Sequence, residues 1–262
     1  MKITGGEAPT MRSSERDFVG ALEKGLAVIE AFDASEPRLT LSEVAHKTGL
    51  TRAAARRYLL TLARLRYAES DGRLFSLTPR VLRLGYAYLS ASPLPKLAQP
   101  VLESIGEKTQ EVASISILEG NEIVFVARSA KRRIMSASND VGTRRPAYCT
   151  SMGRVLLASR PDAEVERLLR ISRPRKFTPK TKTGHRELLR EIGKVRAQGY
   201  ALNDEELEIG LRTIAVPVLD SRGEVSLAMS VSLHSARMSA AQMARKILPL
   251  LQSASKTLSA IL

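Results

Sequence analysis

Apolar residues recur every three or four positions from Phe18 onward, a spacing that predicts an amphipathic helix. The apolar stripe of this helix comprises Leu22, Leu26, Ile29 and Phe32. The dipeptide Glu36-Pro37 ends the helix, because a proline disfavours helical geometry in the residue that precedes it.

Two further helices are predicted between residues 40 and 66. Thr40 stands three residues before Glu43, a capping box that favours a helix start at this point. Gly49 supplies the turn that follows, and Thr51 can cap a third helix that runs to about Arg66.

A β-hairpin is predicted directly after the third helix. Two short half-apolar runs, 67–69 and 73–77, flank Asp71-Gly72, which is a strong short-range hairpin signal. Residues 80–89 again have a helical pattern. The prolines in Ser92-Pro93-Leu94-Pro95 then discourage continuous helix, so we expect a domain boundary there.

The rest of the chain alternates between helical and strand patterns. Apolar runs at 112–118 and 123–128, and again at 213–219 and 225–233, flank turn sequences and are predicted to be paired strands. Predicted helices cover about 96–109, 153–159, 162–170, 187–198 and 239–258, the last kinked at Pro249. This mixture predicts an α+β fold in which helices cover an antiparallel sheet.

These elements divide the chain into four parts. We expect a disordered tail over residues 1–17, which is polar and lacks the apolar stretch of a signal peptide. A winged helix-turn-helix domain is expected over 18–79, a connecting helix over 80–95 and a larger α+β domain over 96–262.

The net charge narrows the class of partner. Lys and Arg number 41 against 27 Asp and Glu, a formal charge of +14, which favours a polyanion such as nucleic acid. No apolar run approaches the roughly 18 residues of a membrane-spanning helix, so we expect no membrane partner. The single cysteine, Cys149, fits a reducing cytoplasm, which is the expected location.

The region around the third helix carries the features of a DNA reader. Ala45 and Gly49 allow two helices to cross closely before a basic helix. Candidate DNA contacts are Thr51, Arg52, Ala53, Arg56 and Arg57 at the start of that helix, and Arg73 on the wing. Between 51 and 83, eight arginines face only Glu69 and Asp71. The alternative is a solvated basic face on a helical bundle.

The larger domain shows no catalytic pattern. The three histidines, His46, His185 and His234, are scattered without metal-ligand spacing, and no histidine pairs visibly with Cys149. We therefore expect no enzyme activity, no metal site and no cofactor.

Polar residues within apolar segments predict a small-molecule pocket instead. The turn Thr150-Ser151-Met152-Gly153 precedes an apolar helix, and its backbone N–H groups are suited to a carboxylate. Ser230 and Ser232 alternate along a strand and therefore face one side. The alternative is a capped helix and an edge strand.

Two basic features remain open at the level of sequence. Arg144-Arg145 can place a guanidinium against a carboxylate, or form a surface pair. The loop from Arg173 to Lys182 is expected to be solvated and outside the pocket, with auxiliary phosphate contact as the alternative.

Long ordered motifs resemble the IclR family of bacterial transcriptional regulators. They are ALEKGLAVIEAF, LTLSEVAHKTGLTRAAARRYLLTLARLRYAE, GRLFSLTPRVLRLGYAYL, GTRRPAYCTSMGRVLLAS and GYALNDEELEIGLRTIAVPVLDSRGEVSLAMSVS. The resemblance implies a winged helix-turn-helix, a linker helix that helps to pair subunits and a GAF-like effector domain. It also implies dimers or tetramers on palindromic operator DNA. The stretch from Pro146 to Arg154 resembles the branch that controls protocatechuate and p-hydroxybenzoate breakdown.

The resemblance also implies where an effector would bind. With the residues singled out above, the candidate effector contacts are Arg144, Arg145, Tyr148, Thr150, Ser151, Met152, Asn203, Asp204, Leu211, Thr213, Ser230 and Ser232. We expect a sequence-specific DNA-binding regulator of aromatic catabolism, controlled by a small aromatic carboxylate. The alternative is a DNA-binding protein whose second domain only oligomerises.

Overall fold

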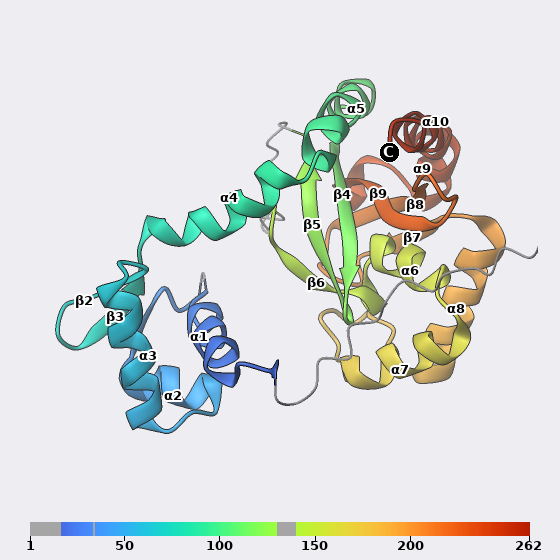
Figure 1. Cartoon of the computed structure of the whole chain (residues 1–262). Coiled ribbons are helices and arrows are strands. Elements are labelled where there is room, and N and C mark those ends of the chain that lie inside the picture. Colours follow the sequence, from blue (N-terminus) through green and yellow to red (C-terminus); the bar gives the residue numbers. More distant parts are fainter. Residues whose placement is uncertain (1–16, 34, 130–139) are drawn as a thin grey trace, which may run out of the picture. The chain divides into compact units, whose positions relative to one another are not determined.

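The computed structural model describes residues 17–33, 35–129 and 140–262. Residues 1–16 of the expected tail therefore lie outside the described residues. The described residues form two compact units, one that ends at Tyr88 and one from Leu89 to Leu262 (Figure 1). Each unit has its own core and is described by itself.

The first unit is built from helices and a small antiparallel sheet. Its elements are α1 (Gly20–Glu30), β1 (Arg38–Thr40), α2 (Leu41–Thr48), α3 (Arg52–Arg64), β2 (Ala68–Ser70), β3 (Leu74–Leu77), the 3-10 helix η2 (Pro79–Val81) and most of α4 (Leu82–Ala91). The strands pair in the order β1-β3-β2. The predicted winged helix-turn-helix is therefore confirmed. The strand β1 was not predicted, because three residues are too few to show the alternation of apolar and polar positions that marks a strand.

The capping pattern read from the sequence fixes the crossing of α2 and α3. Thr40 Oγ1 accepts from the Glu43 N–H at 3.3 Å, and the Glu43 carboxylate accepts from the Thr40 N–H at 2.7 Å. Gly49 adopts φ +66°, a left-handed geometry that glycine takes without steric cost. Thr51 then caps α3 by accepting from the Ala54 N–H at 3.2 Å.

The second unit is a six-stranded antiparallel sheet with helices on both faces. Its elements are α5 (Leu94–Thr109), β4 (Val112–Glu119), β5 (Glu122–Arg128), β6 (Arg144–Pro146), the 3-10 helix η3 (Ala147–Cys149), α6 (Ser151–Ala158), α7 (Asp162–Ser172), α8 (His185–Gln198), β7 (Ala201–Asp204), β8 (Leu211–Leu219), β9 (Val225–His234), the 3-10 helix η4 (Ser235–Arg237), α9 (Ala240–Lys246) and α10 (Leu248–Ser259). The strand order is β6-β5-β4-β9-β8-β7. The predicted α+β class is confirmed.

The last predicted helix is two helices rather than one kinked helix. α9 ends at Lys246 and α10 begins at Leu248, which places Pro249 in the first turn of α10. A proline suits that position because the N–H it lacks would have no partner within the helix. The short strands β6 and β7 were not predicted.

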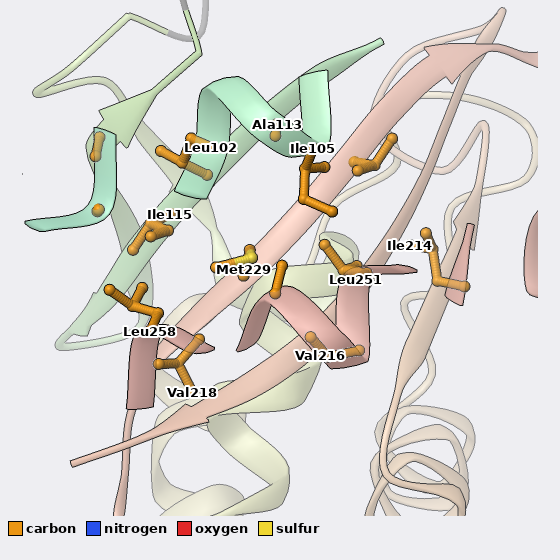
Figure 2. Close-up of a cluster of buried hydrophobic side chains, with 14 of the residues drawn as sticks. Leu102, Ile105, Ala113, Ile115, Ile214, Val216, Val218, Met229, Leu251 and Leu258 are labelled. Atoms are coloured by element: carbon orange, nitrogen blue, oxygen red, sulfur yellow. The ribbon is translucent and has the colours of Figure 1, made fainter. Parts of the chain in front are cut away.

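The two faces of the sheet differ in chemistry, and this difference positions the candidate site. The face beneath α5, α9 and α10 is aliphatic, with Ile115, Val216 and Met229 packed against Leu251 of α10 (Figure 2). The opposite face meets α6, which packs against β8 and β9. There β9 presents hydroxyl-bearing side chains between its aliphatic ones, because successive residues of a strand point to opposite faces.

Candidate functional site

The basic residues of α3 form the candidate DNA-contacting surface. Arg52, Ala53, Arg56 and Arg57 are all exposed, whereas Ala55, Leu59 and Leu62 of the same helix are buried. The helical period thus separates a core face from a face that carries three arginines. Among the described residues, these arginines have no ion-pair partner, so their charges are available to phosphate or to base edges.

The wing adds one further cation. Arg73 is exposed in the turn between β2 and β3. Asp71 holds this turn by accepting from the N–H groups of Arg73 at 3.0 Å and Leu74 at 2.8 Å, and it pairs with Arg38. These interactions hold the pKa of the Asp71 carboxyl below its usual value, and the two backbone hydrogen bonds contribute most to this lowering.

The second unit contains a small cavity between α6 and the hydroxyl-bearing face of the sheet. About 20 Å³ is accessible to the centre of a water-sized sphere. The lining residues are Ile123, Phe125, Cys149, Thr150, Ser151, Met152, Asn203, Leu207, Leu211, Thr213, Ser230 and Ser232. No charged side chain is among them, so ligand recognition here depends on neutral donors, acceptors and apolar contact.

Several hydroxyl groups face this cavity. The Ser151 and Thr213 hydroxyls hydrogen-bond to each other at 2.7 Å. The hydroxyl of Ser230 is buried and has no hydrogen-bond partner among the described residues. A buried hydroxyl without a partner costs roughly 1–3 kcal/mol, so Ser230 is a site where a ligand atom would supply a missing interaction.

The first turn of α6 forms one wall of the cavity. Thr150 caps the helix by accepting from the Gly153 N–H at 3.2 Å. The N–H groups of Ser151 and Met152 are the first two of the helix and have no partner carbonyl within it. Together with the partial positive charge of a helix N-terminus, they are suited to bind an anionic oxygen.

Asn203 connects this wall to the strand opposite. Its side-chain N–H donates to the Cys149 carbonyl at 2.8 Å, and its side-chain oxygen accepts from the Glu206 N–H at 3.3 Å. The side chain therefore has a structural role and retains one N–H for a ligand.

A buried ion pair lies behind the cavity. The Arg154 guanidinium donates to both Glu206 carboxylate oxygens, at 2.5 and 2.7 Å, and its Nε donates to the Tyr148 carbonyl at 2.9 Å. Arg154 lies on α6, one turn after the cap, and Glu206 follows β7. The pair thus holds the two walls of the cavity at a fixed separation.

Cys149 contributes a thiol that is neutral at physiological pH. Burial raises its pKa to about 12, with the Glu206 carboxylate adding to the effect and Arg154 opposing it. A neutral thiol is a poor nucleophile, so Cys149 acts as a small apolar wall residue.

Neither a metal centre nor a membrane span is found in the part of the chain that the structure describes. No three His, Cys, Asp or Glu side chains lie together there as metal ligands would. None of the helices there combines the length and apolar character needed to span a bilayer.

The structure brings eight of the twelve candidate effector contacts to one cavity and leaves four outside its lining. Arg144 is paired with Glu119 and Glu122 at the edge of the sheet, and Arg145 beside it is half-buried, with its guanidinium on the Arg144 carbonyl. Tyr148 is buried in the core with its hydroxyl on the backbone of Arg175, and Asp204 pairs with Arg212. None of these four side chains lines the cavity.

The sequence reading missed part of the cavity. Ile123, Phe125 and Leu207 also line it, and in the sequence they have the same apolar signature as core residues. In the sequence, Arg154 stood out only as the last residue of the stretch from Pro146 to Arg154, without a predicted role. Its partner Glu206 is 52 residues away, and no local signal links the two.

Comparisons with known proteins match both units of the chain. Residues 86–260 match the family model "Bacterial transcriptional regulator IclR C-terminal", and residues 21–72 match the IclR helix-turn-helix domain. The chain belongs to the IclR family of bacterial transcriptional regulators.

Three similar proteins narrow the comparison. The Pca regulon regulatory protein of Pseudomonas putida is 44% identical, covering 94% of this chain and 85% of that protein. The p-hydroxybenzoate hydroxylase transcriptional activator of Acinetobacter baylyi is 39% identical, covering 92% and 91%. The inducer-binding domain of the PobR transcription factor from Acinetobacter, solved as a double mutant with 3-hydroxybenzoic acid, is 31% identical with a TM-score of 0.63, covering 65% of this chain and all of that domain.

Proposed function

We propose that this regulator controls genes of aromatic-acid catabolism and binds a small hydroxylated aromatic carboxylate, such as protocatechuate or p-hydroxybenzoate. The named relatives regulate pca genes or p-hydroxybenzoate hydroxylase, and one related domain was solved with a hydroxybenzoate. Because its operator lies on bacterial DNA, the chain works in the cytoplasm.

The unpartnered Ser230 hydroxyl opposite the start of α6 is the observation that carries this proposal. A hydroxybenzoate needs donors for its carboxylate, an apolar slot for its ring and a polar group for its hydroxyl. The N–H groups of Ser151 and Met152 supply the first, and Phe125 and Leu207 the second. Ser230 and Ser232 supply the third.

The carboxylate is held by neutral donors rather than by an arginine. Arg144 and Arg145, which the sequence suggested as countercharges, do not line the cavity. Arg154, one turn along α6, is neutralised by Glu206. A buried carboxylate can be stabilised by several N–H and O–H donors at a helix N-terminus without a paired cation.

The cavity must enlarge when such a ligand binds. A space of about 20 Å³ accommodates a single water molecule but not a benzene ring. Met152 is the side chain best suited to move, because methionine is unbranched and adapts to irregular spaces. Leu207 lies on the β7–β8 loop and is only partly buried, so it can move at smaller cost.

Isothermal titration calorimetry tests the effector. Protocatechuate and p-hydroxybenzoate are titrated into the wild type and into Ser230→Ala, with Ser226→Ala, an exposed serine on the same strand, as the matched control. We expect affinity to fall about two- to tenfold for Ser230→Ala, as for one lost hydrogen bond, and to be unchanged in the control. Ser151→Leu should abolish binding by filling the cavity.

The outcomes separate this proposal from its alternative. Failure of both acids to bind the wild type would favour a second unit that serves oligomerisation only. Binding that survives Ser151→Leu unchanged would place the effector elsewhere in the unit.

We also infer that the chain acts as a homodimer on a palindromic operator. The first unit has an apolar groove of about 460 Å³, formed by α1, α3 and Leu84 of α4. α4 itself buries no residue, and it exposes Leu82, Tyr86 and Tyr88. Grouped exposed apolar side chains of this kind mark interaction surfaces, and a second copy of α4 fits them chemically.

A further inference from the structure

Most of the excess positive charge of the chain lies in the second unit, outside the winged helix. Residues 1–88 contain 14 Lys and Arg against 10 Asp and Glu, a net +4, whereas residues 89–262 contain 27 against 17, a net +10. Within the second unit, residues 160–196 contain 12 Lys and Arg against 5 Asp and Glu. This segment of α7, the following loop and α8 therefore carries half of the net charge of the whole chain.

Most of the cations in this segment are not neutralised by neighbours. Two of its five acids pair within the segment, Asp162 with Arg196 and Glu191 with Lys182 and Lys194, which leaves the arginines named below without an acidic partner. Six exposed arginines have no ion-pair partner among the residues that the structure describes, and we call them the arginine surface. They are Arg167, Arg170, Arg173, Arg175, Arg186 and Arg190.

The scaffold beneath the arginine surface is fixed. The Tyr148 hydroxyl accepts from the Arg175 N–H at 3.0 Å and donates to the Arg175 carbonyl at 2.8 Å. The Thr178 and Thr181 hydroxyls donate to the carbonyls of Glu205 and Glu206, at 2.7 and 2.5 Å. The loop between α7 and α8 is thus tied to the wall of the effector cavity, so its backbone has little conformational freedom to lose when its cations bind a partner.

We propose that the arginine surface is a second DNA-binding site, which contacts phosphates without reading sequence. Arginine suits this role because its planar guanidinium presents two parallel N–H donors to a phosphate. The chain already binds DNA through its winged helix, so flanking DNA is the polyanion present at the highest local concentration. A second contact on the same molecule would extend the footprint beyond the operator.

The structure argues against an anionic membrane as the partner of this surface. Membrane-surface helices bury an apolar face in the lipid. In α7 that face consists of Val165, Leu168 and Leu169, and all three are already buried in the core of the unit. Ile171 and Phe177 are the large apolar side chains that the described part of this segment leaves exposed, and two separate residues do not form the continuous apolar face that a membrane-surface helix inserts.

Salt-dependent binding to long DNA tests the proposal. The full-length protein is titrated with a 60-base-pair duplex of random sequence, with fluorescence anisotropy as the readout, over a series of salt concentrations. The test variant is R170Q/R186Q/R190Q. The matched control is R245Q/K246Q/K256Q, which removes three exposed cations from α9 and α10 of the same unit.

We expect the test variant to bind about tenfold more weakly near 0.15 M salt, with a slope of log K against log salt that is shallower by about two to three. The control should match the wild type. Equal losses in both variants would reduce the effect to net charge and overturn the proposal. No loss in either variant would also overturn it and leave the surface to an acidic protein partner or to solvent. Thermal melting and effector titration of the same variants report whether the second unit remains folded.

Discussion

Arg154 and Glu206 form a bidentate ion pair in which the side chains are only 2% and 5% exposed. Arg154→Met should destabilise the second unit by about 3–5 kcal/mol, because the Glu206 carboxylate is left buried without its countercharge. Urea unfolding measures this loss.

The double variant Arg154→Met/Glu206→Gln is the informative control for the pair. It removes both charges, so most of the lost stability should return. A surface pair gives the baseline: Arg222, which is 82% exposed, pairs with Asp220, and Arg222→Met should change stability by less than about 1 kcal/mol. A double variant as unstable as the single one would mean that the hydrogen bonds of Glu206, and not its charge, dominate.

The arginines of α3 are expected to determine operator affinity. Arg56→Ala or Arg57→Ala should cost about 1–3 kcal/mol of specific binding where a base contact is lost. Loss of a phosphate contact alone would weaken all sequences equally. Footprinting and anisotropy on operator and random DNA separate the two cases, and Lys24→Ala on α1 provides a variant of equal charge change outside α3. Unchanged operator affinity in both variants would contradict the role of α3.

Gly153 is required by close packing rather than by an unusual backbone angle. A Cβ at this position would overlap the backbone of Ala147 in η3, which cannot move without displacing the cavity wall. Gly153→Ala should therefore cost about 1–3 kcal/mol by overpacking and weaken effector binding. Gly193→Ala on α8, where a Cβ meets nothing within 4 Å, should instead stabilise the protein by about 0.5–1 kcal/mol. Equal melting temperatures for the two variants would refute this account of the wall.

Cys149 should resist alkylation in the folded protein. Burial raises the thiol pKa to about 12, so at pH 8 almost no thiolate is present. The unfolded thiol ionises near its ordinary value, so this contribution to stability is complete below pH 9 and is lost as the pH rises toward 12. Mass spectrometry after iodoacetamide treatment measures the reaction, with urea-unfolded protein as the reactive control. Rapid labelling of the folded chain at pH 8 would show that the cavity opens freely.

The apolar groove of the first unit makes a prediction about assembly. Leu84→Asp should shift the protein from dimer to monomer and weaken operator binding, because one subunit alone contacts a single half-site. Ile261→Asp is the control, because Ile261 is similar to Leu84 in size and exposure but does not line the groove. Analytical ultracentrifugation measures the oligomeric state. A Leu84→Asp dimer as stable as the wild-type dimer would show that the interface lies elsewhere.

The fold was predictable wherever the sequence carried a local signal. The capping box at Thr40 and the hairpin turn at Asp71-Gly72 are both realised, because their hydrogen bonds join residues close in sequence. β1 and β7 were missed because strands of three or four residues have no measurable period. Their pairing is decided by neighbours distant in the chain.

The candidate site was predictable to a similar degree. The alternation of Ser230 and Ser232 within an aliphatic strand indicated a polar-lined face, and the structure gathers them with Thr213 and Ser151. The side-chain positions of Arg144 and Arg145 depend on where β6 joins the sheet edge. This pairing is decided by tertiary structure, so the sequence alone left the role of these two arginines open.

Ser230 has a consequence for anyone who engineers this protein. Its hydroxyl has no hydrogen-bond partner among the described residues, so Ser230→Ala removes the cost of burying it, and a screen for heat resistance would retain this substitution. The same change would remove a group with which we propose that the regulator recognises its effector. Selection for thermal stability would thus yield a protein that binds its effector less tightly. Variants from such a screen therefore need to be tested for induction by the effector as well as for melting temperature.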